Sequence, residues 1–454
     1  MNIIIAGAGE LGRLLAAKLS KYAHDIVLID TDAEILQHIN EKLDVRVQEG
    51  SCLQVKVLKE AGIKKADAFL ALSGNDAVNL MGCRLASKFG VKKTVCRLNS
   101  RDCFSELDSI TADSLGIWAV IEPNEECIRK ILGVLDSRVI MEEIRFSHPD
   151  ALISVWEMRK NNFLAGTRIK DIPAPPGLLE TIRFAAIVRE KTLLVPHGDT
   201  LLVPGDKIYI AGHQDNVHNF IKWAAPEESI PSRARILIAG GTETAGRLAL
   251  LLAGKNYDVR FIHKDRRIQE KILEEAPGNL LAINGLSTDE DTLEEAGVRD
   301  AYAFISAGED DEDNILGCLI AKRMNVEKTI AVTFKPEYIR ITPTMEEINC
   351  SFSSTLVSVN AILRLLETRT MRVDAFLQLF HATLTEFEIT AKSPLCGKKL
   401  METTLPPSLL LALLFRKGEV MVPEGASILE EGDTVVAITT AACEKECEKL
   451  FPKK

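Results

Sequence analysis

A glycine-rich turn near the start of the chain is the segment whose residue types and spacing are best suited to bind a ligand. It has glycines at Gly7, Gly9 and Gly12, after an apolar strand pattern and at the start of a helical one. In such a G-x-G-x-x-G turn the first glycine allows the tight bend, the second lets the backbone approach a pyrophosphate, and the third lets the helix pack closely. Free N–H groups at the helix N-terminus favour the phosphates. The predicted nucleotide-binding residues are Gly7, Ala8, Gly9, Glu10, Leu11 and Gly12.

An acidic residue, Asp30, ends the second predicted strand about 20 residues further on, as it does in dinucleotide-binding domains. Its carboxylate can accept hydrogen bonds from ribose hydroxyls and would repel a 2′-phosphate. The sequence therefore favours NAD(H), or an unphosphorylated adenosine, over NADP(H). The alternative is an empty Rossmann-like domain, in which the glycines only shape a turn and Asp30 is a capping residue.

Further polar groups follow the later strands, at the sheet edge where ligands of doubly wound sheets bind. Arg97 can neutralise phosphate charge, and a surface ion pair is its alternative role. Asp76 and Asn79 begin the next predicted helix and are either caps or ligand contacts. The candidate binding residues along this edge are Ser51, Cys52, Ser73, Gly74 and Arg97.

The chain repeats itself, so these candidates belong to the first of two similar halves. Residues 62–95 match residues 297–330 at an offset of 235 without a gap, and 12 of the 34 positions are identical. A shorter match, at an offset of 227, joins residues 195–206 to residues 422–433. The order is therefore A–B–A′–B′, with a linker at 224–233 that contains Pro and Ser.

The A segments alternate short apolar strands with helical patterns, which predicts a parallel sheet buried on both faces. The B segments show short strands joined by tight turns, which predicts a small α+β module. The predicted fold class is therefore α/β, with two Rossmann-like doubly wound parallel sheets that are each followed by a small α+β domain. In the first A segment we predict strands at Ile3–Ala6, Ile26–Asp30, Val45–Gln48, Ala68–Leu72, Thr94–Cys96 and Ala119–Ile121. Helices are predicted at Leu11–Tyr22, Ala77–Lys88, Glu125–Leu135 and Leu356–Thr368.

The second half carries an altered version of the same site. Its turn reaches the last glycine one residue later than a G-x-G-x-x-G turn does, and His263 stands at the acidic position. Val332 replaces the arginine, and Glu309 adds a carboxylate that is unhelpful to phosphates. A second nucleotide site and a purely structural repeat both stay open. The candidate residues are Gly240, Gly241, Thr242, Glu243, Thr244 and His263.

Composition narrows the class of protein. The 55 Lys and Arg against 65 Asp and Glu give a net charge of -10, which opposes binding to nucleic acid. The longest apolar runs, 248–253 and 409–415, are too short to span a bilayer. We expect no secretion signal, because the chain opens directly on a strand pattern. The 10 cysteines form no C-x-x-C pair and the 8 histidines have no metal-ligand spacing, so we expect a reduced cytosolic setting and no metal site.

No catalytic constellation accompanies the glycine turn. A dehydrogenase needs an acid or a base near the nicotinamide, and the first turn is followed by no suitable histidine. The sequence has no G-x-S-x-G, Walker lysine or H-E-x-x-H motif. The pattern therefore favours a nucleotide sensor without catalytic residues. An NAD-dependent oxidoreductase and a stand-alone soluble nucleotide sensor are the alternatives.

With this order of segments, the chain resembles the TrkA family, the peripheral regulatory subunits of Trk-type bacterial potassium uptake systems. The resemblance covers nearly the whole chain and implies RCK-N (KTN) domains at 1–137 and 232–370, with RCK-C domains at 138–225 and 371–454. Ser51-Cys52, His263 and Val332 depart from the family pattern. The matching residues are Gly7 to Gly12, Asp30, Ala66 to Phe69, Asn75, Asp76, Asn79, Arg97 and the Gly-Asp turns at Gly205-Asp206 and Gly432-Asp433.

The resemblance also implies ligands and partners. It implies binding of NAD(H) and of the adenine nucleotides ATP or ADP, and assembly of the chain into a homo-oligomer, a tetrameric ring. It implies control of a Trk-type potassium-translocating membrane subunit by conformational change. The expected location is the cytoplasm, peripheral on the inner face of the cell membrane.

Overall fold

The structure is a computed structural model of the whole chain. It describes residues 1–20, 24–99, 104, 111–135, 140–146, 148–190, 192–226, 233–335, 337–338, 341–342, 345, 347–366, 372–373, 382–406, 409–440 and 444–452.

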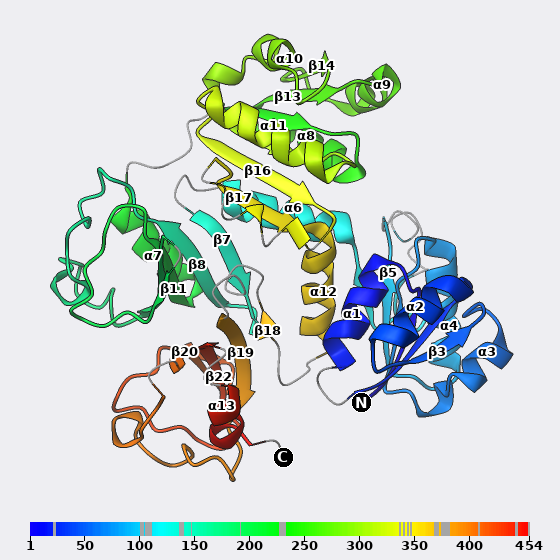
Figure 1. Cartoon of the computed structure of the whole chain (residues 1–454), viewed down its shortest axis with the longest axis horizontal. Helices are drawn as coiled ribbons and strands as arrows, with labels where there is room; N and C mark the ends of the chain where they lie inside the picture. The colour runs from blue at the N-terminus through cyan, green and yellow to red at the C-terminus, as the bar shows by residue number, and fades with distance from the viewer. Residues whose placement is uncertain are drawn as a thin grey trace. The chain divides into compact units, whose positions relative to one another are not determined.

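The first sheet has six strands, β1 (Asn2–Ala6), β2 (Asp25–Asp30), β3 (Arg46–Glu49), β4 (Ala68–Ala71), β5 (Lys93–Arg97) and β6 (Ala119–Ile121). Their order is β3-β2-β1-β4-β5-β6 and every pair is parallel. The central strand β1 is buried on both faces, which explains its run of isoleucines. The strand order reverses between β1 and β4, and such a switch point is where doubly wound sheets bind ligands. The helices of this segment are α1 (Glu10–Leu19), α2 (Ala33–Lys42), α3 (Val55–Glu60), α4 (Asp76–Lys88) and α6 (Pro123–Leu135) (Figure 1).

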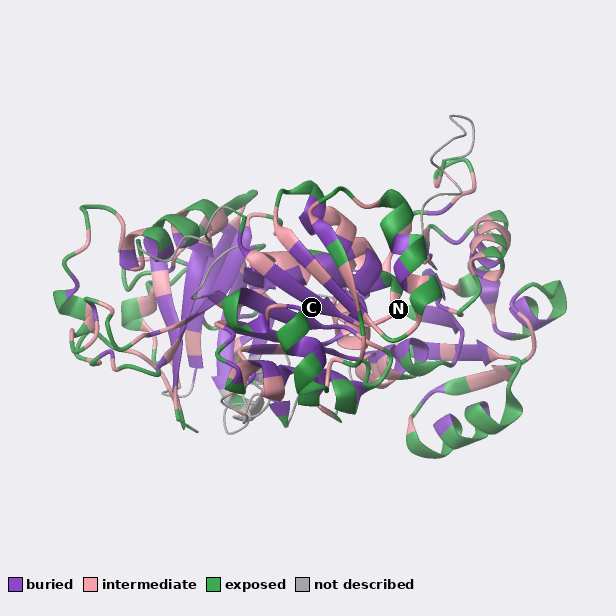
Figure 2. Ribbon diagram, turned by 90° about the horizontal axis from the view of Figure 1, so that it is seen from above, coloured by how far each residue is buried: buried purple, intermediate pink, exposed green. Residues whose placement is uncertain are grey.

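The second half repeats this sheet with β12 (Arg235–Ala239), β13 (Asp258–His263), β14 (Leu280–Asn284), β15 (Ala301–Ser306), β16 (Lys328–Thr333) and β17 (Cys350–Ser353). Their order, β14-β13-β12-β15-β16-β17, is that of the first sheet. The helices are α8 (Glu243–Gly254), α9 (Arg266–Glu275), α10 (Glu290–Glu295), α11 (Asp311–Arg323) and α12 (Ser354–Leu365). Figure 2 shows buried residues gathered in the strands of the sheets and exposed residues on the outer faces of the helices.

The predicted strands and helices of the first A segment are all found, with ends that differ by a few residues. The last residues predicted for two helices, Tyr22 and Thr368, lie outside the described part of the chain, as do 227–232 of the linker. The α/β fold class with two Rossmann-like sheets is confirmed.

By its packing the chain divides into two compact units. The first unit holds Met1–Ile128 and also Ser353–Leu366, which contains α12, so the last helix of the second A segment packs in the first unit, against α1. Lys93 donates from Nζ to the Leu366 carbonyl at 3.4 Å, at the C-terminal end of α12. Carbonyls at a helix C-terminus carry partial negative charge and favour a lysine.

The second unit repeats this lysine contact with α6. Lys328 stands at the same place in the repeat as Lys93, and its side chain is buried. Its Nζ donates to the carbonyl of Val134 in the last turn of α6, and to the carbonyl of Ile140, which lies beyond the helix, at 2.9 Å. The sequence predicted both helices but gave no information on what they pack against.

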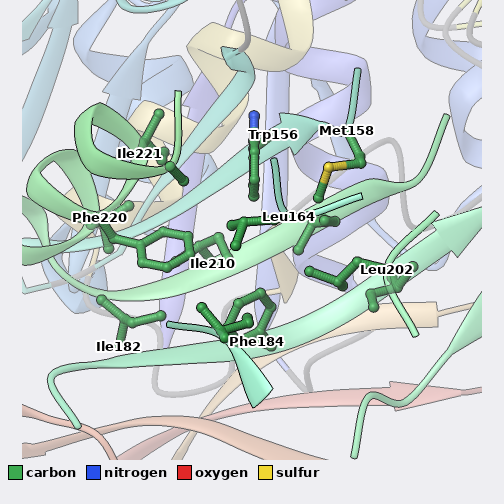
Figure 3. Close-up of a cluster of buried hydrophobic side chains, with 14 of the residues drawn as sticks. Trp156, Met158, Leu164, Ile182, Phe184, Leu202, Ile210, Phe220 and Ile221 are labelled. Atoms are coloured by element: carbon green, nitrogen blue, oxygen red, sulfur yellow. The ribbon is translucent and has the colours of Figure 1, made fainter. Parts of the chain in front are cut away.

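In the described residues, each small module is an antiparallel sheet with one α-helix. The first contains β7 (Ile140–Arg145), β8 (Ala151–Glu157), β9 (Ile182–Arg189), β10 (Thr192–Leu194), β11 (Lys207–His213) and α7 (Gln214–Ala224), in the sheet order β10-β9-β11-β8-β7. The second contains β18 (Arg372–Val373), β19 (Ala382–Glu388), β20 (Leu409–Arg416), β21 (Glu419–Met421), β22 (Thr434–Thr440) and α13 (Glu444–Leu450), in the order β18-β19-β22-β20-β21. In Figure 3 the side chains of Phe220 and Ile221 on α7 point into the apolar cluster that Trp156 and Phe184 share. The Phe220 ring meets Trp156 and Phe184 edge to face, with centroids 6.1 and 5.6 Å away.

Each small module contains the same buried ion pair at its Gly-Asp turn. The Asp206 side chain is fully buried and accepts from Arg189 Nε at 2.7 Å and from a terminal Arg189 nitrogen at 2.8 Å. In the second module Asp433 binds Arg416 in the same two-pronged way, at 2.8 and 2.6 Å. Such bidentate pairs hold a fixed geometry, so the turn is locked to the strand that carries the arginine.

One titrating pair in the first module makes its stability depend on pH. His218 on α7 approaches Glu143 on β7, with 2.8 Å between Nε2 and Oε1. This hydrogen bond raises the pKa of His218, and Asp215 adds to the effect, while partial burial and the charge of Arg145 oppose it. A raised folded-state pKa means that the pair stabilises the module fully below the pKa of an unfolded histidine, about 6.5. The stabilisation is lost as the pH rises through the higher folded-state pKa.

We therefore expect NMR titration to give His218 a pKa above 6.5, and Glu143→Gln to lower it. His197 lies in the exposed turn of the same module and serves as the reference histidine. An unchanged His218 pKa in the Glu143→Gln chain would show that the carboxylate is not the cause.

Candidate functional site

The first glycine turn lies between β1 and α1, and its glycines are needed for close approach. Gly7 has φ +112°, and a Cβ on it would stand 2.8 Å from the backbone nitrogen of Ser73. A Cβ on Gly12 would stand 1.9 Å from the Gly7 carbonyl oxygen, so the helix packs directly on the turn. Gly9 differs, because nothing lies within 4 Å of a Cβ placed there. The two outer glycines thus shape the turn and the middle one keeps open space in front of it.

That open space faces the N-terminus of α1. Gly9 is the N-cap of this helix and provides no side-chain hydrogen bond to its first turn. The first N–H groups of a helix lack intrahelical partners, so an uncapped end favours an anion. Glu10 forms an exposed ion pair with Arg13 at 2.8 Å, and Leu11 is buried under the helix.

Asp30 at the end of β2 is tied to the turn. Its Oδ2 accepts from the Ala8 N–H at 2.5 Å, and its Oδ1 accepts from the Asp32 N–H at 3.0 Å. Each carboxylate oxygen has a second lone pair, so the group can accept further hydrogen bonds. The helix-capping role weighed for Asp30 belongs to Asp32, which accepts from the first turn of α2.

A side-chain amide braces the ends of β4 and β5 beside the turn. Asn79 is buried and donates to the carbonyls of Ser73 and Arg97, both at 2.9 Å. Its Oδ1 accepts from the backbone and the hydroxyl of Ser73, at 2.9 and 2.7 Å. Asn79 is therefore not the N-cap of α4, which is Asn75. Gly74, which follows Ser73, is exposed, and nothing lies within 4 Å of a Cβ placed on it.

Arg97 carries an unpaired buried nitrogen. Its Nε is buried and has no hydrogen-bond partner among the described residues. Burial lowers the pKa of this guanidinium, and the nearby charge of Asp76 opposes that effect. Asp76 itself accepts from the backbone and side chain of Asn99, at 3.0 and 3.1 Å. A buried donor without a partner costs free energy, so Arg97 is suited to meet an anionic ligand.

The two candidates after β3 differ in exposure. Ser51 accepts from the Leu53 N–H at 3.2 Å within the loop. The Cys52 side chain is buried and packs with the apolar residues under the sheet. Burial raises the pKa of the Cys52 thiol, and the charge of Asp30 adds to the shift, so the thiol stays protonated at neutral pH.

The second turn has the same length as the first, which corrects the expectation of an extra residue. Strand β12 ends at Ala239 and α8 begins at Glu243, the same spacing as between β1 and α1. Ala245 takes the place of Gly12, and the later Gly246 makes only ordinary contacts. Gly240 keeps a positive φ of +130°. A Cβ on Gly241 would clash with the His263 ring, and Thr242 caps α8. Glu243 pairs with Arg247, and Thr244 is buried.

Neither a metal centre nor a membrane span is found in the part of the chain that the structure describes. Within those residues no group of three or more His, Cys, Asp or Glu side chains could hold a metal ion. No described helix combines the length and the apolar character needed to cross a bilayer.

The fold and the site define a class of protein, a duplicated Rossmann-like chain with a glycine turn and a small α+β module in each half. A model of the TrkA-N domain matches residues 3–117 and 236–348, and a model of the TrkA-C domain matches residues 158–225 and 384–451. The chain belongs to the TrkA family of Trk system potassium uptake proteins, with tandem TrkA-N and TrkA-C domains.

Relatives match over their full length. The chain is 28% identical to a Trk system potassium uptake protein TrkA homolog of Methanosarcina mazei, over 99% of this chain and 100% of the relative. It is 27% identical to Trk system potassium uptake protein TrkA of Haemophilus influenzae, over 99% and 98%. Among solved structures, the GsuK RCK domain has a TM-score of 0.60 at 20% identity, over 99% of this chain and 94% of that one. A GsuK channel bound to NAD gives a TM-score of 0.60 at 19% identity, over 99% and 78%.

Proposed function

We propose that this chain is the peripheral cytoplasmic regulatory subunit of a Trk-type potassium uptake system, without catalytic activity of its own. In this proposal it binds NAD(H) or an adenine nucleotide in its first half and controls a potassium-translocating membrane subunit. The observation that carries the proposal is the open N-terminus of α1 at Gly9, with Asp30 fixed beside it. The full-length similarity to Trk system potassium uptake proteins supports the partner.

The proposed binding residues divide by role. The turn from Gly7 to Gly12 would hold the pyrophosphate, Asp30 the adenosine ribose, and Arg97 the phosphate charge. Ser51, Cys52, Ser73 and Gly74 would line the same edge, with Cys52 acting through packing. The structure of a GsuK channel bound to NAD, which shares the fold, supports a nicotinamide dinucleotide as the ligand. The domain limits at 137, 225, 232 and 370 are part of the same proposal.

Control of the partner follows from differential binding. A nucleotide can shift a conformational equilibrium only by as much as its affinities for the two states differ. A cleft between β1, β2 and β4 that closes on a nucleotide would move α1, and α12 packs against α1 in the same unit. Helix α12, the last helix of the second A segment, would therefore respond to a ligand in the first half.

Membrane attachment should depend on protein contacts. The net charge of -10 opposes adsorption to anionic lipid headgroups. The chain should therefore be recovered with membranes that contain its partner, and nucleotide should be detected in the purified complex. Recovery only in the soluble fraction would favour the stand-alone sensor, and turnover of NADH with a small carbonyl substrate would favour the oxidoreductase.

We expect NAD(H) to bind more tightly than NADP(H), because the Asp30 carboxylate would face a 2′-phosphate. Asp30→Ala should weaken NAD(H) binding by about 1–3 kcal/mol, the worth of a charge-assisted hydrogen bond to a buried partner. Calorimetric titration with both nucleotides measures this. His263→Ala changes the equivalent position of the second half and should leave the first site unaffected. Equal affinities for the two nucleotides would remove Asp30 from its proposed role.

Assembly into a tetramer should use apolar side chains that both halves expose. Met81 on α4 and Leu316 on α11 occupy equivalent positions and are 51% and 46% exposed. Light scattering after size exclusion should show a tetramer for the wild-type chain and smaller species for Met81→Lys/Leu316→Lys. Leu273→Lys on α9 is the matched control, since Leu273 is 42% exposed outside this pair. A wild-type monomer would contradict the proposed assembly.

A further inference from the structure

The two glycine turns can be compared residue by residue, because both run the same distance from strand to helix. At a constant offset of 233, Gly9 corresponds to Thr242, Ala8 to Gly241 and Asp30 to His263. The second turn thus has a threonine where the first has open space at Gly9, and a histidine ring in place of the Asp30 carboxylate.

The Thr242 hydroxyl makes the contact that a phosphate oxygen would make. Its Oγ1 accepts from the Ala245 N–H at 3.3 Å, in the first turn of α8. The same hydroxyl donates to the Ala307 carbonyl at 2.6 Å, which ties the turn to the end of β15. Gly9 has neither bond available, so α1 is open where α8 is capped.

The imidazole of His263 fills the adjoining position. The Asp265 N–H donates to Nδ1 at 3.0 Å, so in the neutral ring the proton is on Nε2. That nitrogen would stand 2.5 Å from a Cβ on Gly241. The His263 ring therefore requires a glycine at position 241. In the first half the smaller Asp30 side chain leaves room for the Ala8 methyl group.

The second half also differs at the position of the buried arginine. Val332 stands where the first half has Arg97, and the Val332 carbonyl accepts from Asn314, the counterpart of Asn79, at 2.9 Å. Glu309 follows Gly308 at the adjoining strand end and is exposed. The hydrogen bond from the asparagine to the end of the neighbouring strand is thus kept, while the arginine charge that suits a nucleotide is replaced by valine.

We infer that the second Rossmann-like unit is occupied by its own side chains, with the Thr242 hydroxyl at the phosphate position and the His263 ring at the ribose position. These side chains make the contacts that a bound ligand would make. Each chain therefore binds one nucleotide, in the first Rossmann-like domain. This inference rests on the proposed function, in which that ligand is a nucleotide.

Hydrogen exchange tests the self-capping without any nucleotide. The Ala245 amide should be protected in the ligand-free wild-type chain, and Thr242→Val should speed its exchange by about tenfold or more, as expected for loss of a capping bond. Thr242→Ser keeps the hydroxyl and should keep the protection. In the first unit, the corresponding Gly12 amide should become protected only when NAD(H) is added. Equal exchange of Ala245 in the serine and valine variants would overturn the inference.

Calorimetric titration with NADH tests the stoichiometry. The wild-type chain should bind one NADH. The variant Thr242→Gly/Gly241→Ala/His263→Asp/Glu309→Gly/Val332→Arg, which gives the second half the residues of the first at these five positions, should bind two, with the affinity of the first site unchanged. Two NADH per wild-type chain would overturn the inference. So would NADH binding by the Gly9→Val chain, because its second half is unchanged. Both results would leave the proposed function intact. A folded fivefold variant that still binds one would also overturn it. A wild-type chain that binds no nucleotide contradicts the proposed function itself.

Discussion

Gly9→Val is expected to abolish nucleotide binding by the first unit, with a loss of at least about 100-fold in affinity, or about 2.7 kcal/mol. The valine side chain would occupy the space in front of the α1 N-terminus that a pyrophosphate needs. The fold should tolerate the change, because Gly9 has φ −61° and ψ −178°, which valine adopts without strain. Titration with NADH measures the loss.

The matched control is Gly278→Val. Gly278 is exposed, has open space around a Cβ and has no positive φ, so it shares the properties of Gly9 except for its place. It should leave NADH affinity unchanged. If Gly9→Val binds NADH as the wild type does, the ligand does not lie on this turn and the assignment of the first site is wrong.

Asp206→Ala is expected to lower the free energy of unfolding of the first small module by about 2–3 kcal/mol. The Asp206 side chain is fully buried, whereas that of Arg189 is 36% exposed, so water partly compensates the arginine when its partner is lost. The turn also loses the bond from the Val203 N–H, which is 2.9 Å long. Urea unfolding followed by tryptophan fluorescence reports on this module, since Trp156 and Trp223 both lie in its core region.

An exposed pair in the same module provides the comparison. Asp199 contacts Arg168 and Lys170, but its side chain is 71% exposed. Asp199→Ala should therefore leave the unfolding midpoint unchanged, as is usual for surface ion pairs. Equal effects of Asp206→Ala and Asp199→Ala would mean that the buried pair does not hold the turn.

Local patterns predicted the parts of this fold that depend on local physics. The strand–turn–helix at Gly7 to Gly12 follows from apolar periodicity and from the need for glycine at positive φ and at close approach. The repeat at an offset of 235 carried the prediction to the second half. Periodicity did not predict that Thr242 caps α8 whereas Gly9 leaves α1 uncapped. The orientation of the Thr242 hydroxyl depends on the Ala307 carbonyl, which is distant along the chain.

Two functional or structural roles were missed although the repeat contained a signal for them. Asn79 and Asn314 are identical across the repeat and make the same brace between neighbouring strand ends. Lys93 and Lys328 are also identical across it, and each binds a carbonyl at the C-terminal end of a helix, α12 for Lys93 and α6 for Lys328. The sequence marks these residues by their repetition, but their partners are distant along the chain and no spacing rule predicts such contacts.

Nucleotide bound in the first Rossmann-like domain should change potassium transport by a membrane partner. Potassium flux into vesicles that contain the purified membrane subunit of the same system tests it most directly, with the chain added with and without NADH. We predict that flux changes when the wild-type chain and NADH are added together, and that Gly9→Val with NADH has the effect of the chain alone. Flux that is indifferent to NADH for the wild-type chain, or that responds equally with Gly9→Val, would contradict the account.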